Sequence, residues 1–249
     1  GVMGLSDMLI KLGVKYGSEK AITICDQIGA CIADAAIETS SIIAANKGKY
    51  PAYTKDVLHT EFFDRNASYE TREYVEMYGL AHSQLLTIAQ TGTLSTMLGI
   101  SGGLEPIFAN SYIRKTESLK GKDEYYKVYT PIVKQFMDMH GITDESELPD
   151  YFVTAEDIKP IDRIKMQAAF QKHIDASISS TINLPNSATV EDIESLYIEA
   201  WKEGLKGITI YRAGCKRDGI LVADNKQDNA EENMQNDVQI EKDRVQEDL

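Results

Sequence analysis

The residues best suited to chemistry form one short hydroxyl-rich stretch near the middle of the chain, Gln90-Thr91-Gly92-Thr93-Leu94-Ser95. Its three hydroxyl groups and one glycine can converge on an anion, because hydroxyls and free backbone N–H groups both donate hydrogen bonds. The stretch follows residues 85–89, an apolar run that favours a buried strand, and it precedes a segment with helical character. A helix N-terminus here would add the positive end of a dipole. The pattern therefore predicts a phosphate-binding loop between a strand and a helix.

An ordinary helix cap explains the same residues. Ser and Thr are frequent just before helices, because their side-chain oxygens accept hydrogen bonds from the first backbone N–H groups. Both interpretations place Thr91, Thr93 and Ser95 at a junction between loop and helix. The residues of this loop do not by themselves distinguish a phosphate-binding loop from a helix cap.

The composition is that of an ordinary globular protein. The 249 residues are 43% hydrophobic, which suffices for one α/β domain of barrel size or for two smaller domains. A net charge of -13 argues against general binding to nucleic acid or to an anionic membrane surface, because both need clustered Lys and Arg. No apolar run approaches the ~20 residues of a membrane span, and no signal-peptide pattern is present. We expect a cytoplasmic protein with no direct nucleic-acid or membrane partner, although local dipoles still permit a small anionic ligand.

The three cysteines form neither a metal motif nor a disulfide framework. Cys25 and Cys31 lie in an apolar helical pattern and are predicted to be small core residues, whereas Cys215 lies in a loop where exposure is expected. His59 has no second His or Cys at ligand spacing. The chain begins at Gly1 and enters a helical pattern directly, which suggests a piece of a longer protein.

Helix and strand patterns alternate on both sides of the loop. Apolar spacing and terminal Ser, Thr, Pro or Gly residues predict helices. The predicted helices span residues 4–12, 18–48, 68–79, 131–141, 160–176 and 189–204. Two further strands are predicted at residues 177–184 and 208–211, and with the helix between them they form a right-handed parallel crossover unit. The order of these elements predicts an α/β fold.

Two other segments are distinctive. Glu105 follows a glycine pair and precedes Pro106, which excludes a helix interior at this position. We expect Glu105 to have a structural or orienting role and not to transfer protons. Residues 222–249 contain nine acidic and three basic residues and no aromatic one, and this composition predicts a disordered acidic tail.

Three long stretches together resemble the large subunits of ribonucleotide reductases. They are LLTIAQTGTLSTMLGISGGLEPIFANSYIR (residues 85–114), MQAAFQKHIDASISSTINLPNSATVEDI (166–193) and GLKGITIYRAGCKRDGIL (204–221). The N-terminal GVMGLSDMLIKLG fits the same family, as a stretch internal to its catalytic domain. The resemblance covers residues 1–221, and it is specific because several long segments agree in order.

Within this family the chain is most similar to the adenosylcobalamin-dependent class. Large subunits that receive a radical from a separate small subunit carry a Tyr-Tyr pair on a late barrel strand, whereas the corresponding strand here has Tyr211 alone. Tyr125 and Tyr126 lie in a different segment. The resemblance thus implies adenosylcobalamin as cofactor, and a large subunit of the small-subunit-dependent class is the alternative.

The resemblance implies the C-terminal part of a ten-stranded α/β barrel over residues 1–221, followed by the acidic tail of residues 222–249. In this family a cysteine thiyl radical removes a hydrogen atom from the substrate ribose, and a cysteine pair then reduces the 2′-carbon. The radical cysteine lies in an Asn-x-Cys-x-Glu loop, which is absent from this sequence. We therefore expect no catalytic residue of that chemistry in this chain, and no activity of the piece by itself.

The resemblance also implies a substrate-phosphate site in this chain. Gln90, Thr91, Gly92, Thr93 and Ser95 would bind phosphates through backbone amides and hydroxyls, and Gly92 would permit close approach. The family usually has proline before the Thr-Gly pair, where this chain has Gln90. We expect the loop to be less rigid for that reason but to keep its anion contacts.

The implied activity is reduction of ribonucleotides, expected as diphosphates, to 2′-deoxyribonucleotides for DNA synthesis. The implied partners are a ribonucleoside di- or triphosphate, a thioredoxin-like reductant, and a second copy of the full-length enzyme in a homodimer. A function of another class is also compatible with the loop, namely a non-catalytic nucleotide- or phosphate-binding α/β module.

Overall fold

The computed structural model describes residues 2–116 and 124–214. Its described part combines helices with short strands, in agreement with the predicted α/β class. The predicted acidic tail of residues 222–249 and the predicted exposure of Cys215 lie outside the described residues.

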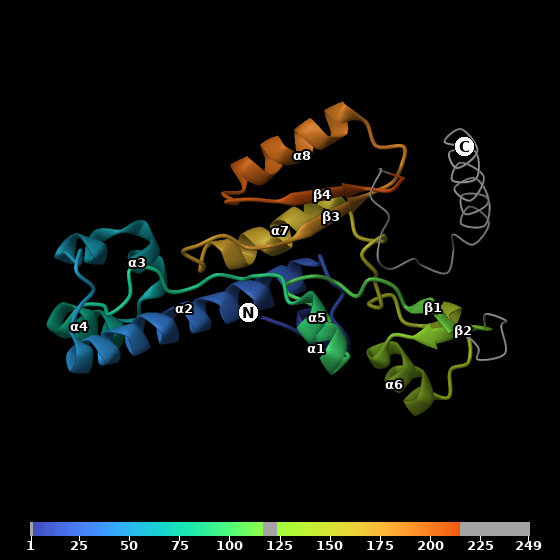
Figure 1. The fold of residues 1–249 in the computed structure, drawn as a ribbon, viewed down its shortest axis with the longest axis horizontal. Helices are drawn as coiled ribbons and strands as arrows, with labels where there is room; N and C mark the ends of the chain where they lie inside the picture. The colour runs from blue at the N-terminus through green and yellow to red at the C-terminus, as the bar shows by residue number, and fades with distance from the viewer. Residues whose placement is uncertain (1, 117–123, 215–249) are drawn as a thin grey trace, which may run out of the picture.

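Helices and strands are stacked in layers, as Figure 1 shows. The long helix α2 (Glu19–Lys47) contacts α7 (Pro160–Gln171), and α7 contacts β3 (Thr181–Leu184). β4 (Thr209–Arg212) pairs with β3, and α8 (Val190–Lys202) lies on the far side of this strand pair from α2. The layers place a helix on each side of the strands.

The predicted crossover unit is present as β3, α8 and β4. The two strands are parallel, with Thr181 opposite Thr209 at the start of the register. α8 begins at the capping box expected from the sequence, in which Thr189 and Asp192 each bond the other's backbone N–H. Apolar side chains of α7, α8 and both strands form one buried cluster beneath the unit.

The predicted strand at residues 85–89 is shorter than expected. Only Ile88 forms a bridge, in parallel with Ile178, and no continuous ladder surrounds it. The carboxylate of Asp175 accepts the N–H groups of the segment's first two residues, at 2.7 and 2.6 Å. A side chain thus replaces the strand partner of these two amides, which interrupts the ladder while it holds the segment beside the chain that leads into β3.

α7 ends at Gln171, before the predicted end at residue 176. The Gln171 side-chain amide donates to the carbonyls of Ile174 and Ala176, at 2.9 Å each. This buried amide satisfies carbonyls that a continued helix would have bonded, because side chain to backbone bonds compete with helix formation. The chain therefore turns toward β3 at this point.

The remaining elements surround this centre. They are α1 (Leu5–Lys11), η1 (Lys55–His59), α3 (Glu61–Asn66), α4 (Tyr69–Tyr78), α5 (Gly92–Leu98), β1 (Ser111–Thr116), β2 (Glu124–Tyr129), α6 (Pro131–His140) and η2 (Glu145–Glu147). α1, α2, α4, α6 and α8 agree closely with the predicted helices. The antiparallel pair β1 and β2 was not predicted, because charged residues obscure the apolar alternation of its strands.

α2 is the one helix of the described part with the length and apolar content of a membrane span. Core helices meet the same two criteria, so one such helix is weak evidence for a membrane. Small and apolar residues of α2, among them Ala21, Cys25 and Ile37, are buried within the protein. The helix contacts α4 and α7, which cover part of its surface.

The two cysteines of α2 differ in their environment. Cys25 is buried, as predicted. The prediction of a core position for Cys31 is wrong, because this residue is exposed. At 3.6 residues per turn, the spacing of the two residues places them on different faces of the helix.

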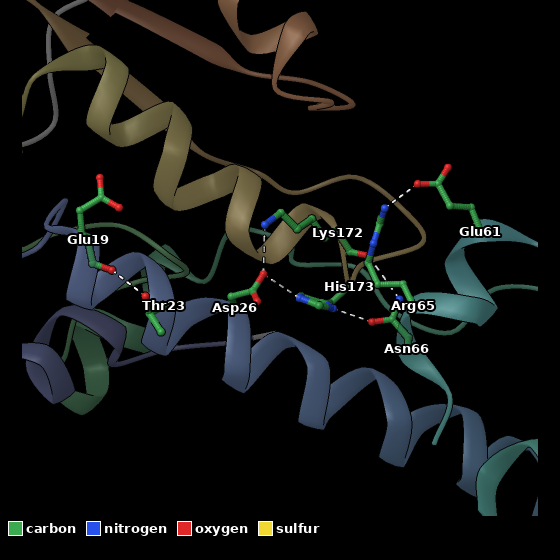
Figure 2. Close-up of polar contacts among 8 residues, drawn as sticks. All are labelled: Glu19, Thr23, Asp26, Glu61, Arg65, Asn66, Lys172 and His173. Carbon is green, nitrogen blue, oxygen red and sulfur yellow. Dashed lines mark hydrogen bonds and ion pairs between the residues drawn. The ribbon is translucent and has the colours of Figure 1, made fainter. Parts of the chain in front are cut away.

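A buried histidine joins α2, α3 and the end of α7 (Figure 2). His173 Nδ1 lies 2.5 Å from Asn66 Oδ1, and His173 Nε2 lies 3.2 Å from Asp26 Oδ1. The Asn66 amide nitrogen donates to two backbone carbonyls, which leaves its oxygen to face the ring. Both ring nitrogens therefore lie beside side-chain oxygens of other elements.

Asp26 is the charged partner in this cluster. Lys172 Nζ approaches the same carboxylate oxygen as His173, at 3.2 Å (Figure 2). Burial would raise the pKa of Asp26, but hydrogen bonds from His173 and Lys172 outweigh it and hold the pKa below its usual value. Gly29 leaves room for the ring, since a Cβ there would stand 2.6 Å from His173 Cδ2. The cluster fixes the end of α7 on α2.

The first prediction concerns the pH dependence of this cluster. Because the pKa of Asp26 is lowered in the folded chain, its stabilising contribution is present above the unfolded value of 3.8 and is lost as the pH falls through the folded pKa. We expect D26N to lower the free energy of unfolding by about 1 kcal/mol or less near pH 5.5, where a histidine is charged in the unfolded chain. Urea unfolding should show this difference shrinking toward about pH 3. A difference that stays constant or grows would contradict the assignment.

The second prediction concerns thiol reactivity. Burial raises the pKa of Cys25 to about 12, so its thiolate is scarce at neutral pH and its sulfur is covered. We expect iodoacetamide to alkylate the exposed Cys31 in the folded chain and to reach Cys25 only in denaturant. Both residues fall in one tryptic peptide, so tandem mass spectrometry must locate the modification. Equal labelling of both thiols under native conditions would contradict the described burial.

Candidate functional site

A cavity of about 660 Å³ opens beside the start of α5. Its walls come from the residues around the start of α5, from residues 99–109, and from the starts of β1 and α6. Ser179, which lies between the Ile178 bridge and β3, completes the lining. The loop predicted to bind phosphate therefore faces this cavity.

Three of the five predicted site residues line this cavity, namely Gln90, Gly92 and Ser95. Thr91 is buried behind the wall, and Thr93 is exposed to solvent outside the lining. The structure thus brings part of the predicted set to the cavity. Thr91 and Thr93 are not among its lining residues.

The buried hydroxyls of Thr91 and Ser95 bond the protein itself. Thr91 Oγ1 accepts the N–H of Gly103 at 2.9 Å, and Ser95 Oγ donates to the carbonyl of Gly92 at 3.0 Å. Gly102 approaches so closely that a Cβ there would stand 2.9 Å from Ser95 Oγ. These contacts hold the start of α5 against the glycine pair.

Thr96 is a lining residue that the sequence analysis did not single out. Its hydroxyl donates to the carbonyl of Gly92 at 2.9 Å, one helical turn away. Residues four apart lie on the same face of a helix, so the spacing of Thr96 from Gly92 was the signal that could have identified it.

The first turn of α5 is left without a cap. No described side chain caps it, since the Thr91 hydroxyl bonds Gly103 instead. The first N–H groups of a helix, here those of Gly92, Thr93 and Leu94, have no partner within the helix. A Cβ built at Gly92 would meet no described atom within 4 Å. The glycine therefore lets a ligand approach these amides directly.

The glycine-rich segment after α5 is anchored by α1. Ser101 donates its N–H to Asp7 Oδ2 at 2.7 Å, and its carbonyl accepts the N–H of Gly4 at 2.8 Å. Ser6 Oγ accepts the N–H of Ile107 at 3.3 Å. An irregular buried backbone needs partners for its polar groups, and the start of α1 supplies them here.

Glu105 lies at the centre of a second set of anchors. Its Oε1 accepts the N–H of Thr181, at the start of β3, at 2.9 Å, and forms an ion pair with the buried Arg163 of α7 at 3.3 Å. Arg163 also lies 3.4 Å from the hydroxyl of Tyr16, which donates to the carbonyl of Leu104 at 2.7 Å. The structure agrees with the structural role expected of Glu105, while Arg163 and Tyr16 were not anticipated from the sequence.

Tyr16 stays neutral at ordinary pH in this network. Burial raises the pKa of its phenol, and the nearby Arg163 offsets only part of that effect. The phenol thus remains a hydrogen-bond donor to the Leu104 carbonyl.

Much of the cavity lining is apolar. The apolar and aromatic lining residues are Ile100, Pro106, Ile107, Phe108, Ala109, Tyr112, Ile113 and Pro131. A pocket that combines polar groups with apolar surface suits a ligand that combines an anionic group with a ring system. The arrangement is one for binding and orienting such a ligand.

The described residues around the cavity offer no metal centre and no activated thiol. Across residues 2–116 and 124–214, no three His, Cys, Asp or Glu side chains gather as metal ligands would. Neither Cys25 nor Cys31 lines the cavity. The burial that raises the pKa of Cys25 also makes it a poor nucleophile.

Comparison with known proteins assigns the family. The family model of the ribonucleotide reductase barrel domain matches residues 1–211. The chain belongs to the ribonucleotide reductase family. The matched range of this reductase domain contains α5, the cavity beside it and the crossover unit up to Tyr211 of β4.

Two relatives that resemble this reductase chain are named vitamin B12-dependent ribonucleoside-diphosphate reductases. The protein from Mycobacterium tuberculosis is 32% identical in an alignment of 237 residues that covers 89% of this chain and 32% of the relative. The protein from Thermoplasma acidophilum is 32% identical, over 90% of this chain and 29% of the relative. A ribonucleoside-diphosphate reductase subunit alpha from Chlamydia pneumoniae is 27% identical, over 83% of this chain and 23% of the relative.

The chain spans about a third of the curated relatives or less. Among solved structures, the alpha subunit of the class Id ribonucleotide reductase of Actinobacillus ureae is similar, with a TM-score of 0.63 at 20% identity. The match covers 86% of this chain and 38% of that subunit. It shows that the described fold is that of a reductase alpha subunit over this part.

The third prediction concerns the contact between Thr91 and Gly103. T91V removes the acceptor of a buried N–H group, and an unsatisfied buried group costs about 1–3 kcal/mol. We expect urea unfolding to show a loss of this size for T91V and little change for T91S, which keeps the hydroxyl. T93V is the matched control, because Thr93 is exposed and its hydroxyl has no such role. Equal effects of T91V and T93V would show that the Thr91 contact does not stabilise the loop.

Proposed function

We propose that the chain is the C-terminal part of the catalytic barrel of an adenosylcobalamin-dependent ribonucleotide reductase, and that its cavity binds the phosphates of a ribonucleoside diphosphate. The observation that carries the proposal is the uncapped first turn of α5 at the wall of the cavity, within the range that matches the reductase barrel family. The names of the relatives, ribonucleoside-diphosphate reductases, support a diphosphate as substrate.

The phosphates would bind mainly to backbone amides. The N–H groups of Gly92, Thr93 and Leu94 supply donors, and the Gln90 side chain supplies a further amide from the rim. Ser95 and Thr96 can accept or donate through hydroxyls that already bond the carbonyl of Gly92. Thr91 would contribute by holding this geometry through its bond to Gly103.

The apolar wall would receive the rest of the nucleotide. With the phosphates at α5, the sugar and base would extend along a surface that includes Phe108 and Tyr112. This chain would thus bind and orient the substrate. The hydrogen abstraction from the ribose and the reduction of its 2′-carbon would fall to cysteines that these residues do not supply, since the Asn-x-Cys-x-Glu loop is absent from the sequence.

The described strands would be neighbouring strands of a ten-stranded barrel. Three parallel segments support this arrangement, because the Ile88 bridge pairs with the chain before β3 and β3 pairs with β4. Parallel strands joined by a helix are the repeating unit of α/β barrels.

The names of the relatives support adenosylcobalamin as cofactor of the whole enzyme. We assign no residue of this chain to the cofactor, whose role would be to generate the radical.

The partners proposed for the whole enzyme follow from its chemistry. Each turnover oxidises a cysteine pair to a disulfide, so a thioredoxin-like dithiol would be needed to reduce it again. A homodimer and a cytoplasmic location complete the proposal. A small-subunit-dependent enzyme is the second candidate, and the subunit alpha relatives favour it. Membership of the reductase family disfavours an unrelated phosphate-binding module.

The fourth prediction tests the phosphate site with G92A. A Cβ at Gly92 meets no described atom, so the fold should tolerate the methyl group while the approach of an anion to the amides is obstructed. We expect calorimetric titration of the 249-residue chain to show binding of ADP and inorganic pyrophosphate. For G92A the affinity should fall about tenfold, a change of ~1.4 kcal/mol, with an unchanged free energy of unfolding.

The control is G207A. A Cβ at Gly207 would lie 3.4 Å from Ser177 Oγ, away from the cavity, and ADP affinity should match that of the wild type. Adenosine, which lacks phosphate, should bind much more weakly than ADP. No binding of ADP by the wild-type chain, or equal binding by wild type and G92A, would refute the proposed site.

A further inference from the structure

The charge of the cavity is opposed to its proposed ligand. The chain has a net charge of -13, and an acidic protein repels anions unless local groups reverse the potential. Among the described residues that line the cavity, Glu105 alone carries a formal charge, and that charge is negative. A phosphate at α5 and a carboxylate in the same cavity would repel each other across a poorly screened space.

Arg163 lies directly behind this carboxylate. Its guanidinium forms the 3.3 Å ion pair with Glu105, and its side chain is only 6% exposed while that of Glu105 is 28% exposed. Arg163 does not line the cavity and has no other carboxylate partner among the described residues. Its positive charge therefore pairs with Glu105, the one acidic residue among the described lining residues.

The surroundings keep the guanidinium in this position. It lies over the ring of Tyr16, with 5.7 Å from its central carbon to the ring centroid, and 3.4 Å from the Tyr16 hydroxyl. Arg163 Nε is buried without a described partner. A buried charge with an unsatisfied hydrogen-bond donor destabilises the fold unless an opposite charge compensates it. Glu105 is that opposite charge here.

From this arrangement we infer that Arg163 is the charge-compensating residue of the cavity, which neutralises Glu105 and so allows a phosphate-bearing ligand to bind beside α5. The inference rests on the proposed function, because it specifies how the proposed site accepts an anion. Arg163 acts through Glu105 and is a positioning residue that does not touch the ligand. The same pair also holds Glu105 on the N–H of Thr181, which keeps the carboxylate in one place.

The electrostatic role can be isolated by substitution, because few groups face this carboxylate. The groups that face Glu105 are Arg163 from α7, the Tyr16 phenol between α1 and α2, and the Thr181 N–H at β3. Burial raises the pKa of the Tyr16 phenol, so the phenol adds no charge at neutral pH. Among these groups, Arg163 is the one with a formal charge.

The experiment compares R163M, E105Q and the double variant E105Q/R163M in the 249-residue chain, with ADP as the probe. R163M leaves the wall with an uncompensated carboxylate, so ADP affinity should fall about tenfold at pH 7. E105Q/R163M, which has neither charge, should bind ADP as the wild type does.

The E105Q variant provides an independent arm, should R163M fail to fold. Its amide oxygen can still accept the Thr181 N–H, while the wall loses its negative charge and Arg163 keeps its positive one. E105Q should therefore bind ADP more tightly than the wild type, and equal or weaker binding overturns the inference. An R163M affinity equal to that of the wild type, or a loss that persists in the double variant, also overturns it. If the wild-type chain does not bind ADP at all, it is the proposed function that fails.

Discussion

The arrangement of the site depends on one constraint, which is that an irregular backbone segment, residues 101–107, passes through the interior of the protein. Buried N–H and carbonyl groups must be bonded, and a segment without regular structure bonds few of its own groups. Side chains from α1, from the loop before α2 and from Thr91 at the start of α5 provide partners for its backbone. Arg163 of α7 pairs with its Glu105 side chain. Elements that are distant in sequence are thereby held around the cavity.

This constraint explains why the hydroxyl-rich loop has more than one role. The side chains of Thr91 and Ser95 are used to fix the loop against the glycine pair, so they are buried and bonded within the protein. Because Thr91 is engaged with Gly103, it does not cap α5, and the first amides of that helix are free for a ligand. The two interpretations that the sequence left open, a structural turn and an anion site, are therefore compatible. The hydroxyls serve the structure, and the backbone provides the proposed binding groups.

Polar side chains also determine where helices and strands end. Gln171 bonds the turn after α7, and Asp175 takes the place of a strand partner for the segment before α5. Gln167 bonds the chain just before each of the two parallel strands, at the carbonyls of Gly207 (2.8 Å) and Ile178 (3.5 Å). Each of these side chains is long enough to reach backbone groups remote in sequence. The short strands are therefore joined to α7 by side-chain bonds as well as by apolar packing.

The sequence by itself determined most of the longer helices, the crossover unit, the family and the loop, because these follow from local spacing, from caps such as Thr189 and from long ordered motifs. It could not determine the truncated strand at residues 85–89, the antiparallel pair β1 and β2, or the exposure of Cys31. Those depend on which distant groups compete for the backbone and on which face of a helix is covered. The pairing of Arg163 with Glu105 was likewise decided only by the tertiary structure, since residues far apart in the chain meet there through the packing of α7 against the glycine-rich segment. Local sequence patterns determine the helices and strands, whereas polar contacts between residues far apart in the sequence assemble the site.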